Sequence, residues 1–383
     1  MNNQKWLSLN FFAFFFTWGI FLPYWTGWLT NEKALSVSAA SIVMGAGMIA
    51  RSLSTLLFFP LMTRLLPLGR LMQGLAIASV ALMALYIPSN SYVPLLIITA
   101  AFSFVYSNIL PSMESGATVL MQTDGIHYGK SRSWGSIGYT VALLIVGAAT
   151  ALWQEKAILW IMLAGLLFMA FTQSAASPAP LRIVPKPKNA LASSTVKELL
   201  KSKTFLVILL ASILLQGAHA AYYSYGFIYL QDIGVNSFYI GIILNVAILF
   251  EIIFFAKADN LFDKWSVSSM FLLAGAGSTL RWILIFAFPS VWMFIASQAL
   301  HALSFGVAHF AFIRYIFKEL KPHHIPAAQG MYAALAMSLS VALLTIASGF
   351  LYEFSPGLAF LGMISFSVPA ILLVLLTRRK YQY

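Results

Sequence analysis

Long, uninterrupted apolar blocks are the feature that most limits what this chain can fold into. The runs at 9–29 and 205–230 are each long enough to cross a bilayer core, which takes roughly 20 helical residues. About twelve such blocks follow one another, separated by short polar segments. The blocks cover 6–29, 38–62, 71–88, 92–117, 133–152, 157–174, 204–230, 237–257, 269–288, 291–317, 327–351 and 357–377. Because the apolar character is continuous and does not alternate, it predicts helices and not barrel strands.

The composition is typical of a chain that faces lipid. Of the 383 residues, 60% are hydrophobic and 9% are charged, whereas a soluble domain is about 25% charged. The absence of cysteine excludes disulfides and thiolate metal sites. The first block begins almost at Met1 and leads into further spans, so we expect no cleaved signal peptide. The predicted fold class is an all-α integral membrane protein with twelve transmembrane helices.

The net charge of +12 is distributed unevenly across the predicted loops. With the N-terminus in the cytoplasm, the outer loops hold only Lys33 and Lys156, and most other Lys and Arg residues fall in inner segments. This bias is the positive-inside signal, which predicts that both termini are cytoplasmic. The basic excess therefore orients the protein, and we expect no nucleic-acid partner.

The longest gap between blocks divides the chain into two sets of six. Residues 175–203 are rich in Pro, Ser and Lys and are predicted to be a cytoplasmic linker. It separates an N-terminal six-helix half, 1–174, from a C-terminal six-helix half, 204–383.

The two halves correspond at an offset of about 200 residues. Arg51 falls opposite Glu251, and Arg64 falls opposite Lys264. A parallel six-plus-six repeat is typical of the major facilitator fold, whose substrate site lies near the bilayer midplane. The alternative is that any twelve-span chain shows some periodicity.

Several ionisable residues fall inside the predicted spans. They are Arg51, Glu114, Glu251, Arg281, His219, His301 and His309. A central Arg or acidic residue costs roughly 2.5–3.5 kcal/mol on insertion scales, so these residues should face one another or a wet cavity. By default such a set marks a substrate or proton path.

Helical spacing places some of these residues on shared faces. In the fourth block a polar stripe consists of Ser103, Ser107, Pro111, Glu114 and Thr118. In the tenth block the same stride joins Gln298, His301, Phe305 and His309. Arg314 lies on roughly the opposite face of that block, where a charge anchored at the interface is the better interpretation.

Each buried charge also has a purely structural interpretation. Arg51 could pack as an ion pair with Glu114 or Glu251, and Arg281 could simply neutralise Glu251. His219 and His309 could be satisfied neutral residues within the bundle.

The proton carrier is left open among three residues. His301 is a candidate because imidazole titrates near neutral pH. Glu114 and Glu251 are candidates because a carboxylate shielded from water takes up a proton more readily than one in water.

We expect no metal site. His301 and His309 lie eight residues apart, and His323 and His324 are adjacent in a cytoplasmic loop. Neither spacing is that of a zinc-binding helix, and no carboxylate stands beside these histidines in the sequence.

Aromatic residues are the other candidate binding groups. Trp18, Phe21 and Trp25 share a face of the first block. The alternative is an interfacial belt, which suits Trp25 and Trp28 because they lie near the outer end.

The seventh block repeats this arrangement with tyrosines. Tyr222, Tyr225 and Tyr229 share a face, and Tyr222 and Tyr223 lie deeper than Tyr229. Aromatic side chains around one fixed cation would suit an aromatic carboxylate. A sugar or a nucleoside also stacks on such rings.

Several strings resemble the 3-phenylpropionate/proton symporters of enteric bacteria, a branch of the major facilitator superfamily. They are GIFLPYW (19–25), GAGMIAR (45–51), YGKSRSWGS (128–136), LLQGAHAAYY (214–223) and LHALSFGVAHFAFIRYI (300–316). The likeness runs from about residue 6 to the last block. It implies a symporter in the bacterial inner membrane.

A more distant likeness is to lactose permease. Glu114 and Arg132 match its galactoside-binding glutamate and arginine, while the resemblance assigns Arg281, His301 and Glu251 to its proton and sugar machinery. The sequence departs where that permease has its proton-carrying glutamate, because Ser304 stands there, and its seventh-helix aspartates are missing from AYYSYGF.

These observations together predict a proton-coupled symporter that imports a small aromatic carboxylate by alternating access. The substrate-binding residues are predicted to be Arg51, Glu114, Arg132, Trp18, Trp25, Tyr222 and Tyr223. Proton coupling is assigned to Glu114, Glu251, Arg281 and His301. The alternative is a proton symporter for a neutral sugar or nucleoside, centred on Glu114 and Arg132. We expect a lipid-embedded functional monomer without cofactors, and not an enzyme.

Overall fold

The computed structural model describes residues 2–175, 177–183 and 192–383, and within these ranges the chain is helical without strands. Eleven helical spans in them are long and apolar enough to cross a membrane. A further apolar helix, Leu68–Ala84, has 17 residues and rises about 26 Å. Each predicted apolar block lies on one of these spans, so the predicted all-α membrane fold is confirmed.

The chain forms two compact units. One comprises residues 1–188 and 236–242, and the other comprises 189–235 and 243–383. Within the predicted linker, residues 176 and 184–191 lie outside the described residues. The described part of the linker contains a short 3-10 turn, Ala179–Arg182, and the helix α9, Ala192–Lys201.

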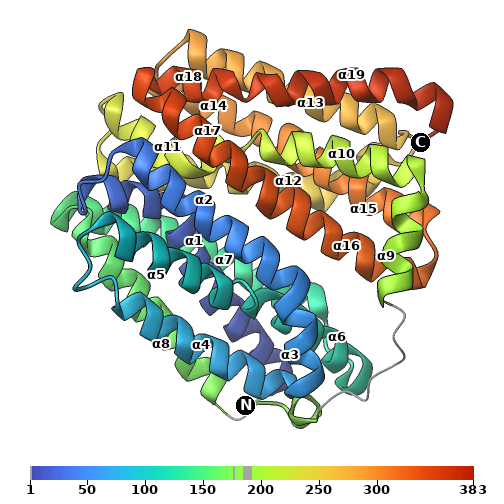
Figure 1. Ribbon diagram of the computed structural model, residues 1–383, viewed down its shortest axis with the longest axis horizontal. Helices are drawn as coiled ribbons and strands as arrows, with labels where there is room; N and C mark the ends of the chain where they lie inside the picture. The colour runs from blue at the N-terminus through green and yellow to red at the C-terminus, as the bar shows by residue number, and fades with distance from the viewer. Residues whose placement is uncertain (1, 176, 184–191) are drawn as a thin grey trace. The chain divides into compact units, whose positions relative to one another are not determined.

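The first unit is built around its N-terminal helix. Figure 1 shows α1 beside α7. Helix α1 also contacts α8. Helix α2 packs on α5, and α4 packs on both α5 and α8. The elements are α1 (Asn3–Asn31), α2 (Val37–Leu53), a π-helical segment (Ser54–Phe58), α3 (Phe59–Leu65), α4 (Leu68–Ala84), α5 (Tyr92–Tyr106), α6 (Ile109–Asp124), α7 (Tyr128–Trp153) and α8 (Lys156–Ser174). The close approach of α1 and α7 depends on Gly138, because a Cβ there would overlap the backbone of Phe12.

The second unit packs its helices around α10 and α13. Helix α13 contacts α14, α15 and α19, and α10 contacts α15, α17 and α19. The elements are α9, α10 (Lys203–Gly217), α11 (Ala220–Asp232), α12 (Ser237–Phe262), α13 (Val267–Ala287), α14 (Val291–His301), a π-helical segment (Ala302–Gly306), α15 (Val307–Glu319), a 3-10 turn (Pro322–His324), α16 (Ile325–Met331), a π-helical segment (Tyr332–Leu339), α17 (Ser340–Phe354), α18 (Pro356–Gly362) and α19 (Ile364–Tyr381).

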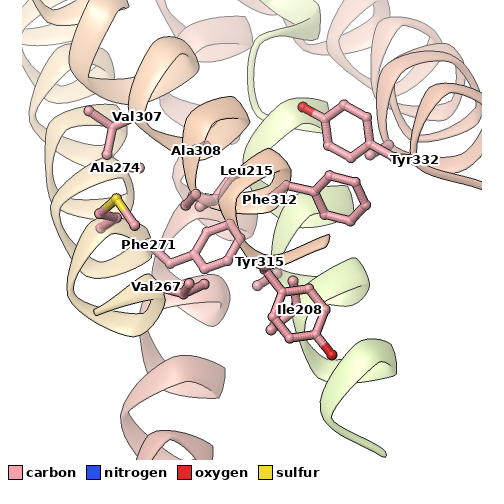
Figure 2. Close-up of a cluster of buried hydrophobic side chains, with 14 of the residues drawn as sticks. Ile208, Leu215, Val267, Phe271, Ala274, Val307, Ala308, Phe312, Tyr315 and Tyr332 are labelled. Atoms are coloured by element: carbon pink, nitrogen blue, oxygen red, sulfur yellow. The ribbon is translucent and has the colours of Figure 1, made fainter. Parts of the chain in front are cut away.

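The core of the second unit is apolar and tightly packed. Figure 2 shows Ile208 and Leu215 of α10, Phe271 of α13 and Phe312 of α15 within one cluster. The ring of Phe312 stacks on that of Tyr332 at a centroid distance of 4.3 Å and an angle of 18°. This core holds α10, α13 and α15 in place, and it thereby positions Arg281 on α13 and His301 at the end of α14.

Serine side chains begin four of the helices. Ser36, Ser202, Ser266 and Ser290 each accept a hydrogen bond from the backbone N–H three residues later. A capping oxygen satisfies one of the four N–H groups that a helix start leaves without a partner. These serines therefore fix the starts of α2, α10, α13 and α14.

Two predicted spans are broken near their middle. The fourth block divides into α5 and α6 at Ser107 and Asn108, because Pro111 has no N–H and its ring crowds the carbonyl of residue 107. The seventh block divides into α10 and α11 at Ala218 and His219. The predicted polar face of the fourth block is therefore split between two helices, whereas Tyr222, Tyr225 and Tyr229 of the seventh block all lie on α11.

Candidate functional site

Arg51 lies in the last turn of α2 and covers an aromatic ring of α1. Its guanidinium carbon is 4.7 Å from the centroid of Trp18. Within the described part of the first unit, no carboxylate forms an ion pair with Arg51. The predicted alternative of a packing ion pair with Glu114 is therefore wrong, and the cation is held by ring contacts.

A narrow cavity lies beside this arginine. It has a volume of ≈10 Å³, about enough for one water molecule. Its lining comes from α1, α2 and α5 and consists of Trp18, Phe21, Leu22, Met44, Gly47, Met48, Arg51, Ser103, Tyr106 and Ser107. Aromatic rings, methionines and two serine hydroxyls thus surround a single positive charge.

Tyr106 holds the rings of this cavity in place. It stacks on Trp18 at 6.2 Å and on Phe14 at 5.2 Å, and its hydroxyl is 2.7 Å from that of Thr17. Tyr106 was not among the predicted site residues. Its spacing in the sequence could have indicated it, because Tyr106 lies three residues after Ser103 and therefore on the same helical face.

Trp25 lies away from the cavity. Its side chain is fully buried, stacks on Trp28 at 4.6 Å and meets Tyr86 edge-on at 5.0 Å. The predicted belt alternative is wrong for Trp25 and Trp28, because a belt residue faces the lipid interface and these two rings face the protein. Trp25 reaches the cavity only through Phe21, whose ring is 5.5 Å away.

Glu114 and Arg132, which the resemblance places in one candidate binding site, meet elsewhere in the first unit. Arg132 Nε lies 3.6 Å from Glu114 Oε1, and each side chain is 35% exposed. The guanidinium of Arg132 also covers Phe15 at 4.0 Å. Because the helix breaks before Pro111, the predicted polar stripe divides: its first two serines line the Arg51 cavity, while Glu114 pairs with Arg132.

The second unit contains a buried cluster around Arg281 of α13. Arg281 is fully buried, and it donates hydrogen bonds to His301 Nδ1 at 3.0 Å and to Gln298 Oε1 at 3.3 Å. Its guanidinium covers the rings of Tyr222 at 4.3 Å and Trp282 at 4.6 Å. Gln298 and His301, which the sequence placed on one helical face, thus both contact this arginine.

His301 links Arg281 to Glu251. Because Arg281 can only donate, Nδ1 of His301 is assigned as the acceptor, and the ring proton is then on Nε2. Nε2 faces Glu251 Oε2 at 3.6 Å. His301 therefore lies between Arg281 and Glu251 and contacts both.

The two predicted tyrosines border this cluster. The ring of Tyr222 is 5.5 Å from that of His301, and the ring of Tyr223 is 6.4 Å from it. On the other side, Phe305 stacks on His301 at 5.2 Å with the planes 5° apart. The π-helical segment that starts at Ala302 follows His301 directly, and such segments occur frequently at functional sites.

The other two histidines in the spans have hydrogen-bond partners in the same unit. His219 Nδ1 donates to the Leu215 carbonyl at 2.9 Å, and Nε2 accepts from Ser304 at 2.9 Å. His309 Nδ1 lies 2.9 Å from the hydroxyl of Tyr332. These contacts fit the alternative in which both are satisfied neutral residues.

Arg314 donates to the carbonyls of Phe262 and Asp263 at the end of α12, as expected of an anchored charge.

A carboxylate does stand beside the loop histidines, in contrast to the sequence expectation. Glu198 of α9 lies 2.9 Å from His324 Nε2, and one donor atom each of Glu198, His323 and His324 lies within 4.8 Å of the others. The hydrogen bond from His324 lowers the pKa of Glu198 below its usual value. Sequence patterns gave no sign of this contact because about 125 residues separate its two sides.

The fold and these buried charges define a secondary transporter of the major facilitator type. The model of the MFS_1 like family matches residues 5–362, and the chain belongs to that family. It is 28% identical over 376 residues to a probable 3-phenylpropionic acid transporter of Escherichia coli (strain K12), with 97% of each chain covered. It is also 28% identical to the maltose permease of Geobacillus stearothermophilus, covering 90% of this chain and 86% of the permease.

Solved structures agree with this fold. The crystal structure of the nucleoside transporter NupG superposes with a TM-score of 0.84 over the whole of both chains, at 16% identity. The POT family transporter PepTSo superposes with a TM-score of 0.80 over 99% of this chain and 98% of its own, at 11% identity.

Proposed function

We propose that this protein imports a small aromatic carboxylate, such as 3-phenylpropionate, together with a proton. The observation that carries the proposal is Arg51, whose guanidinium lies over Trp18 without an ion-pair partner among the described residues of its own unit. A cation inside a membrane span costs free energy, and an anionic substrate would offset that cost. The name of the Escherichia coli relative supports the same class of substrate.

The chemistry of the cavity suits an aryl acid. Guanidinium offers a planar, two-pronged set of donors that matches a carboxylate, and it stays charged. The rings of Trp18, Phe21 and Tyr106 offer faces on which an aryl group can stack. The hydroxyls of Ser103 and Ser107 add further hydrogen bonds.

Binding must be accompanied by movement. The cavity volume of ≈10 Å³ holds about one water molecule and not a phenyl ring. The walls beside Arg51 therefore have to separate when a substrate enters. Alternating access, in which the two halves of such transporters rock around the site, provides this movement.

Glu251 is the best candidate for carrying the proton. His301 already bears its proton on Nε2, and a second proton would have to replace the donor that Arg281 directs at Nδ1. Glu114 lies 3.6 Å from Arg132, so a proton on Glu114 would remove the negative charge of this ion pair. Glu251 Oε2 lies 3.6 Å from Nε2 of His301, so a proton taken up by Glu251 changes the charge directly beside the Arg281–His301 pair.

Proton coupling gives the import of an anion its driving force. Moving one negative charge inward against a negative-inside potential costs roughly 2.3 kcal/mol per 100 mV. A proton that enters with the anion removes this cost, because the pair is neutral. It also adds the pH gradient as a source of energy.

A neutral sugar or nucleoside is the second candidate substrate. The Glu114–Arg132 pair favours it, because both side chains are about one-third exposed and offer donors and acceptors side by side. The similarity to a maltose permease is consistent with this candidate. In this case Arg51 would serve the packing of α1 against α2.

Liposomes that contain the purified protein and an internal pH-sensitive dye distinguish the two candidates. We expect the interior to acidify when 3-phenylpropionate or cinnamate is added, and not when a galactoside or nucleoside is added. Protein-free liposomes measure the passive entry of the protonated acids. A signal with the galactoside or nucleoside alone would contradict the proposal.

We further propose that the protein lies in the bacterial inner membrane with both termini in the cytoplasm. Because the chain has no cysteine, single cysteines can be labelled without background. A membrane-impermeant maleimide should label Glu32→Cys in intact spheroplasts and Lys130→Cys only after permeabilisation. The reverse pattern would show that the predicted orientation is wrong.

A further inference from the structure

A large apolar groove runs along the first unit away from the cavity beside Arg51. Its volume is ≈800 Å³, and α1, the end of α7 and α8 form its walls. The lining residues are Phe12, Phe16, Trp153, Lys156, Ala157, Trp160, Ile161, Ala164, Gly165 and Phe168. Lys156 is the only charged residue among them, and it is the first residue of α8.

Small residues on α8 and rings on α1 shape the groove. The small side chains of Ala157, Ala164 and Gly165 line the groove and leave space in it. The rings of Phe12 and Phe16 stack on each other at 6.3 Å and form one wall. A Cβ on Gly165 would come within 2.9 Å of the Phe16 ring, so the glycine lets this wall pack against α8.

The length and the polarity of the groove match one lipid chain. From Lys156 to Phe168 the axis of α8 rises about 18 Å, close to the roughly 15 Å of one leaflet of the hydrocarbon core. Trp153 and Trp160 are 60% and 58% exposed at the end that carries Lys156. Tryptophans and a lysine at a helix end are typical of the interface between headgroups and acyl chains.

We infer that this groove binds a phospholipid with an anionic headgroup. One acyl chain lies along α8 between Ala157 and Phe168, and the ammonium of Lys156 binds the headgroup phosphate. The positive charge at one end of an otherwise apolar groove favours this occupant over an uncharged molecule and over an apolar face of a second copy of the chain. This site is independent of the transported substrate.

Native mass spectrometry of the detergent-solubilised protein tests the inference. With phosphatidylglycerol and phosphatidylethanolamine added at equal concentration, we expect one retained phosphatidylglycerol per chain. Lys156→Gln should reduce its preference over phosphatidylethanolamine about fivefold, the contribution of one lysine at an anionic surface. Lys203→Gln is the matched control, because Lys203 is also an exposed first residue of an apolar helix.

A second pair of variants tests the groove itself. Ala164→Trp fills the groove and should abolish retention of the lipid, whereas Leu167→Trp, at an exposed position of α8 outside the groove, should leave it intact. Equal retention of both lipids with no effect of Lys156→Gln would overturn the inference. An equal loss of lipid retention in Leu167→Trp would also overturn the inference, because it would indicate that lipid coats the surface without a specific site. A dimer mass that only Ala164→Trp removes would overturn it as well, because the groove would then bind a second copy of the chain.

Discussion

Replacing Arg51 by alanine is expected to reduce transport of 3-phenylpropionate roughly 10- to 150-fold. The estimate follows from about 1.5–3 kcal/mol for a hydrogen bond to a charged group, at 1.36 kcal/mol per factor of ten. No carboxylate of the first unit's described residues pairs with this guanidinium, so its removal leaves no buried acid uncompensated. The measurement is the initial rate of substrate counterflow in liposomes, which does not depend on a proton gradient.

Two further variants separate charge from geometry. Arg51→Lys keeps the positive charge but loses the planar pair of donors, so an intermediate rate is expected. Arg64→Ala removes an exposed arginine of α3 that does not line the cavity, and it should transport normally. If Arg51→Ala transports the acid as fast as the Arg64→Ala control, Arg51 is a packing residue and the carboxylate site lies elsewhere.

Replacing Glu251 by glutamine is expected to separate transport from proton movement. Glutamine has nearly the same shape as a protonated glutamate, so substrate exchange should continue. An imposed pH gradient should no longer increase net substrate uptake. In the unmodified protein this increase is up to tenfold per pH unit for one coupled proton. The measurement compares counterflow with uptake driven by a pH gradient of one unit.

The rival carriers provide the controls for this experiment. Glu114→Gln breaks the pair with Arg132 and should keep its response to the gradient if Glu251 carries the proton. His301→Asn removes the group that positions Glu251 and should shift the pH dependence of uptake without abolishing coupling. Loss of the gradient response in Glu114→Gln but not in Glu251→Gln would show that the assignment is wrong.

The two variants address different steps of one cycle. Arg51 supplies a fixed charge for the anion, and its loss should affect counterflow and net uptake alike. Glu251 supplies a variable charge, and its loss should affect only net uptake. This contrast makes a failure of substrate binding distinguishable from a failure of coupling.

The spans themselves could be predicted from the sequence. A bilayer core offers no water to backbone N–H and C=O groups, so a long apolar run has to form a helix that satisfies them internally. Charges within such runs have to face the protein interior, which is why the sequence alone singles out Arg51, Glu114, Glu251, Arg281 and His301. The resemblance placed Glu114 and Arg132 in one candidate binding site, and the structure places the two side chains 3.6 Å apart.

The arrangement of those residues was decided by the tertiary structure. Periodicity assumes an unbroken helix, and Pro111 interrupts it, so Ser103 and Glu114 serve different sites. The position of Trp25 along its helix indicated an interfacial belt, but packing against Tyr86 buries it. The position of a residue along its helix follows from the sequence. The residues that its side chain contacts depend on how the other helices pack against that helix.

Contacts between distant segments lie beyond the reach of sequence patterns for the same reason. Glu198 meets His324, and His301 joins Arg281 to Glu251, across separations that no helical period describes. The sequence by itself determined which residues are helical, which charges are withheld from lipid and which end of each span is basic, because these follow from the local cost of exposing polar groups to lipid. Only the tertiary structure decided which charges are paired and which remain available for a substrate, because that depends on side-chain packing between helices.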